Sequence, residues 1–169
     1  MSLESFKTRV LPVKDKLFRY TLRILKNEDE AKDVVQETFI KVWNKRDEMD
    51  KLENMEAWCV RVARNLALDK LKSKHNNSVD IDNAYDLQTS NQSPYSSAEQ
   101  SDTMRSIHHF INQLPDMQKQ IIQLRDIDGF SYQEISDILK QNLNTVKVNL
   151  FRARKQVREQ LIQVNAYGL

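Results

Sequence analysis

Apolar residues recur every three or four positions along most of the chain, the spacing that places them on one face of an α-helix. The pattern is clearest from Asp29 to Trp43, where Asn27, followed three residues later by Glu30, supplies a capping signal ahead of the stripe. A second long stripe runs from Ala57 to Leu71. The periodicity is lost from Arg46 to Met55, so the sequence predicts a loop between these two helices.

Prolines interrupt the remaining helical patterns. One short helix is predicted before Pro12 and another after it, and a second pair lies on either side of Pro115. The whole chain of 169 residues contains only two glycines and three prolines, with 40% apolar residues. So few turn-forming residues, combined with helical spacing, predict an all-α fold.

Near the C-terminus the signals describe two helices joined by a tight turn. Ser131 is a good N-cap, and Glu134 stands three residues later, as in a capping box. Residues Lys140 to Leu143 are too few for any element except a turn, and Asn144 is a candidate cap for the helix that follows. That second helix carries an apolar stripe of Val146, Leu150, Ala153, Val157 and Leu161.

The second of these helices is strongly basic. Between Ile138 and Arg158 there are six Lys or Arg residues and no carboxylate. On a helical wheel, five residues lie opposite Val146 and would face outward, and Lys147 lies at the edge of this outward side. A solvated basic surface explains the charge alone, but the cap, turn and acid-free helix together favour a DNA-binding helix-turn-helix. The outward set is Asn144, Val148, Phe151, Arg152 and Lys155.

The composition changes abruptly in the middle of the chain. No Lys or Arg occurs from His75 to Met104, and the segment is acidic and polar. It has too few apolar residues to offset the entropy of ordering, so we expect a flexible linker. The predicted architecture is all-α, with two small helical domains, 1–74 and 104–169, joined by an acidic polar linker, 75–103.

Several classes of function are disfavoured. The lone Cys59 forms no metal-ligand spacing with His75, His108 or His109, so we expect no metal site. Catalytic motifs and phosphate-binding glycine loops are absent from the sequence, which predicts no enzyme activity and no cofactor. We also expect no membrane insertion and a cytoplasmic location, because the N-terminus lacks an apolar signal region.

Two blocks of sequence resemble the sigma-70 family of bacterial RNA polymerase initiation factors, in particular its extracytoplasmic-function (ECF) group. The first block joins DEAKDVVQETFIKVW, from Asp29, to AWCVRVARNLALDKLK, from Ala57. The second joins LPDMQKQIIQLRDIDGFSYQEISDIL, from Leu114, to NTVKVNLFRARKQV, from Asn144. The resemblance implies a protein that binds core RNA polymerase and promoter DNA, melts the DNA and directs transcription initiation.

The same resemblance assigns roles to individual residues. Asp33, Gln36 and Glu37 would bind the polymerase clamp. Asn65 would hold a base flipped from the minus-ten element while Arg61, Arg64 and Lys72 meet phosphates. Val148-Asn149 departs from the Ser-Arg of many relatives, which leaves the preferred DNA sequence open. The implied minus-thirty-five contacts are Thr145, Lys147, Val148, Phe151, Arg152 and Lys155.

Two alternatives to this function stay open at this stage. An autonomous helix-turn-helix regulator would bind a palindromic operator without polymerase, and a helical adaptor would bind only protein. The basic helix that contains Asn65 is needed by neither. That helix, with Trp58 and its basic flank, also suits single-stranded nucleic acid, although Trp43 and Trp58 are more typical of a core. Many relatives are held inactive by an anti-sigma protein, which makes an anti-sigma factor a further candidate partner.

Overall fold

The computed structural model describes residues 1–78 and 101–166, and every element in these two ranges is a helix or a helical turn. The prediction of an all-α fold is therefore confirmed. The described residues divide into two compact units, one centred on each range. The part of the predicted linker from 79 to 100 lies outside the described residues.

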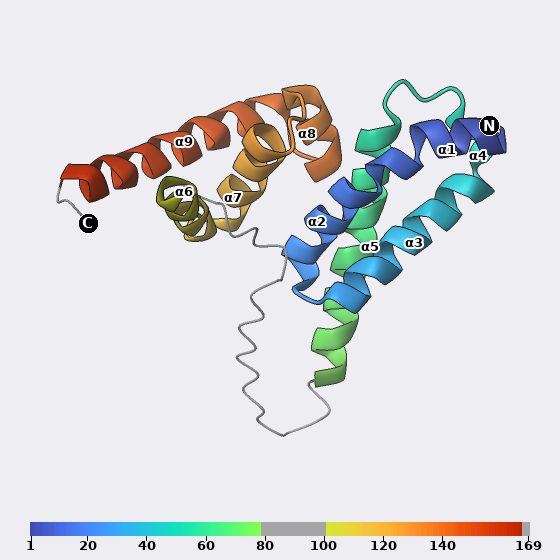
Figure 1. Ribbon diagram of the computed structural model, residues 1–169, viewed down its shortest axis with the longest axis horizontal. Helices are drawn as coiled ribbons and strands as arrows, with labels where there is room; N and C mark the ends of the chain where they lie inside the picture. Colours follow the sequence, from blue (N-terminus) through green and yellow to red (C-terminus); the bar gives the residue numbers. More distant parts are fainter. Residues whose placement is uncertain (79–100, 167–169) are drawn as a thin grey trace. The chain divides into compact units, whose positions relative to one another are not determined.

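The first unit is a bundle built on three longer helices. Helix α2 packs against both α3 and α5, and α3 packs against α5, as Figure 1 shows. Leu17, Val34 and Val60 come from these three helices and are fully buried between them. The elements are α1 Leu3–Arg9, the 3₁₀ turn η1 Leu11–Val13, α2 Lys14–Leu25, α3 Glu28–Asn44, α4 Arg46–Met49 and α5 Met55–Ser78.

Side-chain caps fix where the two long helices begin. The Asn27 side chain accepts a hydrogen bond from the backbone N–H of Glu30 at 3.0 Å, which confirms the capping signal read from the sequence. Asn54 does the same for α5, accepting from the backbone N–H of Ala57 at 2.9 Å. Each cap satisfies one of the backbone donors that the first helical turn leaves without an intrahelical partner.

Two predicted boundaries in this unit are corrected. The segment from Arg46 to Met55 is not wholly a loop, because its first four residues form α4 and bury Met49 in the core. Four residues carry too little periodicity to reveal a helix. Helix α5 also continues to Ser78, four residues into the segment predicted as linker, since no Gly or Pro stops it.

In the second unit, α6 and α7 both pack against α9. Pro115 directly precedes α7, as its position in the sequence predicts. Gly129 has a φ of 78°, a left-handed conformation that glycine adopts without strain, and it completes the turn before α8. The elements are α6 Asp102–Asn112, α7 Asp116–Ile122, the π-helical turn η2 Gln123–Ile127, α8 Tyr132–Leu139 and α9 Leu143–Ala166.

Helices α8 and α9 form the predicted helix-turn-helix. Ser131 caps α8, accepting from the backbone N–H of Glu134 at 3.1 Å. Lys140 ends α8 in the left-handed conformation, with φ 53°. The cap of α9 is Asn142, whose side chain accepts from the backbone N–H of Thr145 at 2.7 Å. The prediction that Asn144 caps this helix is wrong, because α9 begins one residue before it.

The two asparagines give a direct test of the cap. Asn142→Ala is expected to lower the free energy of unfolding by about 1 kcal/mol, the typical cost of losing an N-cap side chain. Asn144→Ala is the matched control, because Asn144 is exposed within the first turn, and its effect is expected to stay below about 0.5 kcal/mol. Urea denaturation followed by circular dichroism measures both. A larger loss for Asn144→Ala contradicts the assignment.

Candidate nucleic-acid and protein interfaces

Helix α9 has one packed side and one open side. Val146, Leu150 and Ala153 are buried, as the apolar stripe predicts. On the opposite side the apolar side chains of Val148 and Phe151 are 46% and 66% exposed. The predicted contact residues on this open side are Lys147, Val148, Phe151, Arg152 and Lys155, with Thr145 half-buried at its edge.

Arg154 differs from the other cations of α9. Its guanidinium donates to both carboxylate oxygens of Asp126, at 2.9 and 2.6 Å. That hydrogen bond is the main reason that the pKa of Arg154 is raised above its ordinary value. The sequence counts Arg154 among six basic residues, but the structure neutralises it and uses it to tie α9 to the turn before α8.

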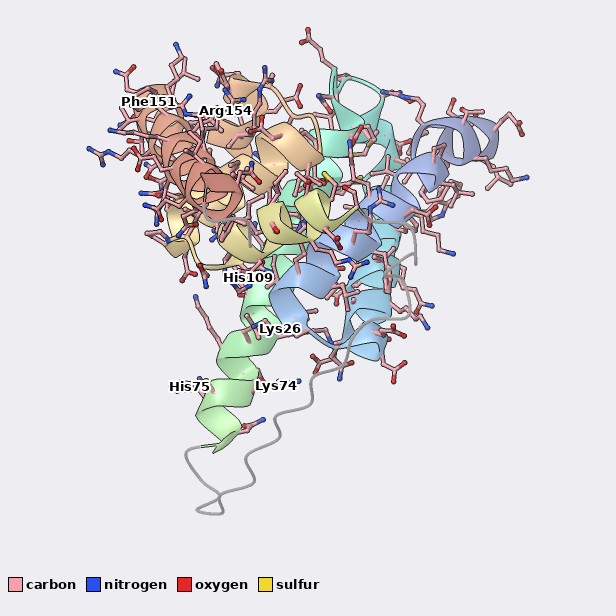
Figure 2. All side chains as sticks on the ribbon, turned by 60° about the vertical axis from the view of Figure 1, so that its left-hand side comes forward. Lys26, Lys74, His75, His109, Phe151 and Arg154 are labelled. Atoms are coloured by element: carbon pink, nitrogen blue, oxygen red, sulfur yellow. The ribbon has the colours of Figure 1, made fainter. Side chains whose placement is uncertain are left out.

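Tyr132 is a residue that the sequence reading missed. The guanidinium of Arg125 lies 4.6 Å from the centre of its ring and also donates to the backbone carbonyl of Phe130 at 2.8 Å. Tyr132 lines a surface hollow of about 260 Å³ beside Phe151, which Figure 2 labels with Arg154 on α9. Most of the remaining lining residues are basic, and all of these except Arg154, which is paired with Asp126, are available to a phosphate. The basic residues are Lys147, Arg154, Lys155 and Arg158.

Helix α5 also presents a basic face. At about 100° per residue, the four predicted contact residues fall within about 100° of the helix circumference. Trp58 is half-buried and lies on the same side, while Val60 and Ala63 are buried on the other. The face combines exposed and half-buried side chains: Arg61 and Arg64 half-buried, Asn65 and Lys72 exposed.

Trp43 has a packing role instead. Its ring meets Phe6 edge to face, with 5.5 Å between centroids, and the Arg46 guanidinium lies 5.1 Å from its centre. These contacts hold α1 and α4 against the end of α3. The interpretation of Trp43 as a core residue is consistent with this environment. Trp58, in contrast, is half-buried on the basic side of α5, where a ligand could contact it.

The outer side of α3 is acidic and polar. Asp33, Gln36 and Glu37 are all exposed, while Val34 and the other stripe residues face the core. The sequence reading missed Ile40, which is 58% exposed. It lies seven residues after Asp33 and therefore on the same side of the helix. A partner bound on this side of α3 would bury Ile40 and so add an apolar contact to those of the polar side chains.

The remaining candidate chemistry is structural. Cys59 is buried, as its apolar neighbours predict, and burial, with a smaller contribution from Glu56, raises the pKa of its thiol to about 12. His109 is exposed and hydrogen-bonds Gln113 at 3.1 Å. Within residues 1–78 and 101–166, no group of His, Cys, Asp and Glu has a metal-binding arrangement. In the same residues no helix has the length and apolar content to cross a bilayer.

Family models match both units. The model of sigma-70 region 2 matches residues 10–76, and the model of sigma-70, region 4 matches residues 104–157. The first range contains the acidic face of α3 and the basic face of α5. The second contains the helix-turn-helix, so each candidate surface lies inside a matched region.

Curated relatives and a solved structure agree with these matches. The ECF RNA polymerase sigma factor SigW of Bacillus subtilis is 30% identical over 157 residues, covering 88% of this chain and 84% of that protein. RNA polymerase sigma factor SigV of the same organism is 30% identical, with coverage of 88% and 86%. The sigma factor RpoE of Bartonella quintana, solved with the anti-sigma factor NepR, superposes with a TM-score of 0.76 at 25% identity, covering 94% and 98%. CnrH has the same fold, with a TM-score of 0.62 at 18% identity.

Two helical units that match regions 2 and 4 of sigma-70 identify a transcription initiation factor that binds DNA. The chain belongs to the ECF group of the sigma-70 family of RNA polymerase sigma factors. Its function is that of a sigma factor, which binds RNA polymerase and directs it to promoters. Matches to both regions favour this function over an autonomous helix-turn-helix regulator.

Proposed function

We propose that three helix faces divide the work of initiation. The acidic face of α3 holds core RNA polymerase, the basic face of α5 captures the minus-ten element, and the open side of α9 binds the minus-thirty-five element. The observation that carries the proposal is that each of these helices buries one side in its own unit and leaves the named residues on the other. The chain itself performs no catalysis, since nucleotide polymerisation belongs to the enzyme it joins.

On α3, Asp33 and Glu37 supply negative charge in the two helical turns before the exposed Ile40. Neither carboxylate forms an ion pair with any residue in the described ranges, so both are available to a partner. A basic surface on the polymerase would gain attraction from the carboxylates and would bury the isoleucine. Gln36 lies between them and can donate or accept a hydrogen bond.

On α5, Asn65 is the polar residue suited to a base edge, because an amide donates and accepts at once. Arg61 and Lys72 lie on the same side of the helix and supply phosphate contacts, as does Arg64 at its border. The buried Nε of Arg64 has no acceptor among the residues that the structure describes, so no hydrogen bond from this atom fixes the guanidinium in place. Capture of a flipped base by Asn65 offsets part of the cost of unstacking it, and so favours DNA melting.

On α9, the polar and basic residues of the open side contact DNA. Lys147, Arg152 and Lys155 bind phosphates or base acceptors, and Thr145, near the start of the helix, contacts the DNA backbone. The helix enters the major groove with its open side, since the opposite stripe is occupied by packing. This docking leaves Arg154 to hold α9 through Asp126.

Asn65→Ala tests the role of α5. The variant is expected to form the closed promoter complex with an affinity within about twofold of the original chain. Its rate of promoter opening is expected to fall about tenfold, which corresponds to roughly 1.4 kcal/mol of lost transition-state stabilisation. Gel shift at low temperature measures the first step, and permanganate reactivity of unpaired thymines measures the second.

Asn76→Ala is the matched control for this experiment. Asn76 is exposed on α5 eleven residues further along, about 16 Å from Asn65 along the helix axis. It is expected to affect neither step. Equal losses in closed-complex affinity and opening for Asn65→Ala would refute base capture by this residue.

Asp126→Asn tests whether Arg154 is kept from DNA by its ion pair while the other cations of α9 bind phosphate. Loss of the carboxylate charge releases Arg154 from its ion pair and makes one more cation available to phosphate. The holoenzyme is expected to bind promoter duplex more tightly at low salt. The slope of the logarithm of the binding constant against the logarithm of the salt concentration is expected to be steeper by about 0.9. Asp116→Asn makes the same change of charge on α7, where the carboxylate lies 3.8 Å from Lys119. An equal change of slope in both variants contradicts the release of Arg154.

An anti-sigma factor is a further proposed partner. The Bartonella relative was solved in complex with one, and its sequence and fold match nearly the whole of this chain. We place the proposed action in the cytoplasm, where polymerase and DNA are located. Such a partner would act by covering one of the three faces described above.

A further inference from the structure

Two apolar side chains stand at the centre of the open side of α9. Phe151 is 66% exposed and Val148 is 46% exposed. They are three residues apart, so their side chains project within about 60° of each other. We call them the α9 apolar pair. Exposed apolar side chains of this size, surrounded by cations, mark a surface that is covered in a complex.

Two polar side chains near the pair, Asn149 and Arg154, are engaged within the chain. The Asn149 side chain turns back and donates from Nδ2 to the carbonyl of Thr145 at 2.8 Å. Arg154 is held by both oxygens of Asp126. Neither of these two side chains therefore competes with the apolar pair for a base edge, and the pair itself presents only carbon to whatever α9 binds.

Charge identifies the class of ligand. Lys147, Arg152 and Lys155 surround the pair, and none forms an ion pair with a residue that the structure describes. The hollow beside Phe151 adds Arg158 and the ring of Tyr132. No carboxylate occurs between residues 138 and 158. A neutral lipid or an apolar peptide has no need of so many cations, whereas duplex DNA offers phosphates on both sides of an exposed groove floor.

In the major groove, the one apolar group on the edges of the bases is the C5 methyl group of thymine. We propose that Val148 and Phe151 recognise pyrimidine 5-methyl groups in the promoter, so that the duplex element read by α9 contains thymine at the step facing this pair. The inference depends on the docking of α9 proposed above. Because 5-methylcytosine carries its methyl group at the same position, this chain senses methylation of cytosine placed at that step.

The experiment uses the complex of the full chain with core RNA polymerase. Duplexes containing a randomised segment are first selected for binding, and each thymine of the enriched element is then replaced by uracil, which lacks only the methyl group. At one or two positions the replacement is expected to weaken binding about fourfold per methyl group, equivalent to about 0.8 kcal/mol. The same replacement is expected to have no effect on complexes that carry both Val148→Ala and Phe151→Ala.

Two comparisons make the result specific. Ile162→Ala removes a side chain that is 60% exposed on the same helix, three turns beyond Phe151, and is expected to keep the fourfold preference for thymine over uracil. Replacing the sensitive thymine by cytosine and then by 5-methylcytosine is expected to recover about fourfold in affinity. The first result excludes a general effect of shortening an exposed side chain on α9, and the second assigns the preference to the methyl group.

Failure of the methyl proposal can be distinguished from failure of the proposed docking of α9. If duplexes are enriched but uracil weakens binding equally in the original chain and the double variant, the α9 apolar pair does not read methyl groups, and the proposal is overturned while the docking of α9 stands. If the complex enriches no duplex, the proposed docking itself fails, and the methyl proposal fails with it. Loss of the preference in Ile162→Ala also overturns the proposal, because it assigns the effect to helix stability.

Discussion

Replacing both Arg152 and Lys155 by glutamate is expected to lower the affinity of the holoenzyme for promoter duplex at least 100-fold. Both side chains are exposed on the open side of α9, and neither is paired with a carboxylate in the described residues. A hydrogen bond to a charged group contributes about 1.5–3 kcal/mol, so loss of two phosphate contacts removes about 3 kcal/mol or more. Since 1.4 kcal/mol corresponds to tenfold, the loss exceeds two orders of magnitude before repulsion is added.

Fluorescence anisotropy with a labelled promoter duplex measures this loss. The control is a chain with Lys7 and Lys14 replaced by glutamate, which undergoes the same change of net charge on exposed positions of the other unit. It is expected to bind within about threefold of the original affinity. Unchanged binding by the Arg152 and Lys155 variant, with intact helical circular dichroism, would support a protein adaptor in place of DNA contact through α9.

Replacing Asp33 and Glu37 by lysine is expected to weaken binding to core RNA polymerase at least 100-fold. Close charge pairs across interfaces have coupling energies of about 1.5–7 kcal/mol, so reversal of two such charges removes about 3 kcal/mol or more. The change leaves the core of the first unit intact, because both side chains are exposed and the stripe containing Val34 lies on the other side of α3.

The measurement is titration of the labelled chain with core polymerase in the absence of DNA. A control with Glu4 and Glu53 changed to lysine has the same net charge as the Asp33 and Glu37 variant, and both residues are exposed outside α3. Its affinity is expected to stay close to that of the original chain. If both variants lose affinity equally, total charge rather than the α3 face governs the association.

Local signals in the sequence predicted much of the fold. The caps at Asn27 and Ser131 depend only on a side chain and a backbone N–H three residues apart, so the sequence contains the whole interaction. The cap of α9 was assigned wrongly because Asn142 and Asn144 are both suitable residues. The choice between them depends on the left-handed turn at Lys140, which the sequence does not specify at a lysine.

Contacts between distant residues explain what the sequence could not predict. Arg154 and Asp126 lie 28 positions apart, so a count of charges along α9 cannot reveal that one of its cations is neutralised. Helix α4 forms where Met49 reaches the core, although its four residues show no periodic pattern. Ile40 had a readable signal, since it falls outside the buried stripe of α3, but its exposure becomes informative only beside Asp33 and Glu37.

For α9, the helical wheel drawn from the sequence agrees with the exposure of side chains in the structure. Periodicity alone predicted that Val148 and Phe151 face outward, and the structure confirms their exposure. The packing stripe from Val146 to Val157 determines that side, because burying it leaves only one orientation of the helix. The role of these outward residues in recognising DNA is a proposal, because it depends on phosphates and methyl groups in the major groove that the chain itself does not contain.

The central claim is most directly tested by mixing the purified chain with bacterial core RNA polymerase, separating the complex by size-exclusion chromatography, and transcribing genomic fragments with it. The chain is expected to elute with the polymerase, and transcripts are expected to start at defined promoters at which core polymerase alone starts none. A chain that fails to join the polymerase, yet shifts duplex DNA on its own, would contradict the account.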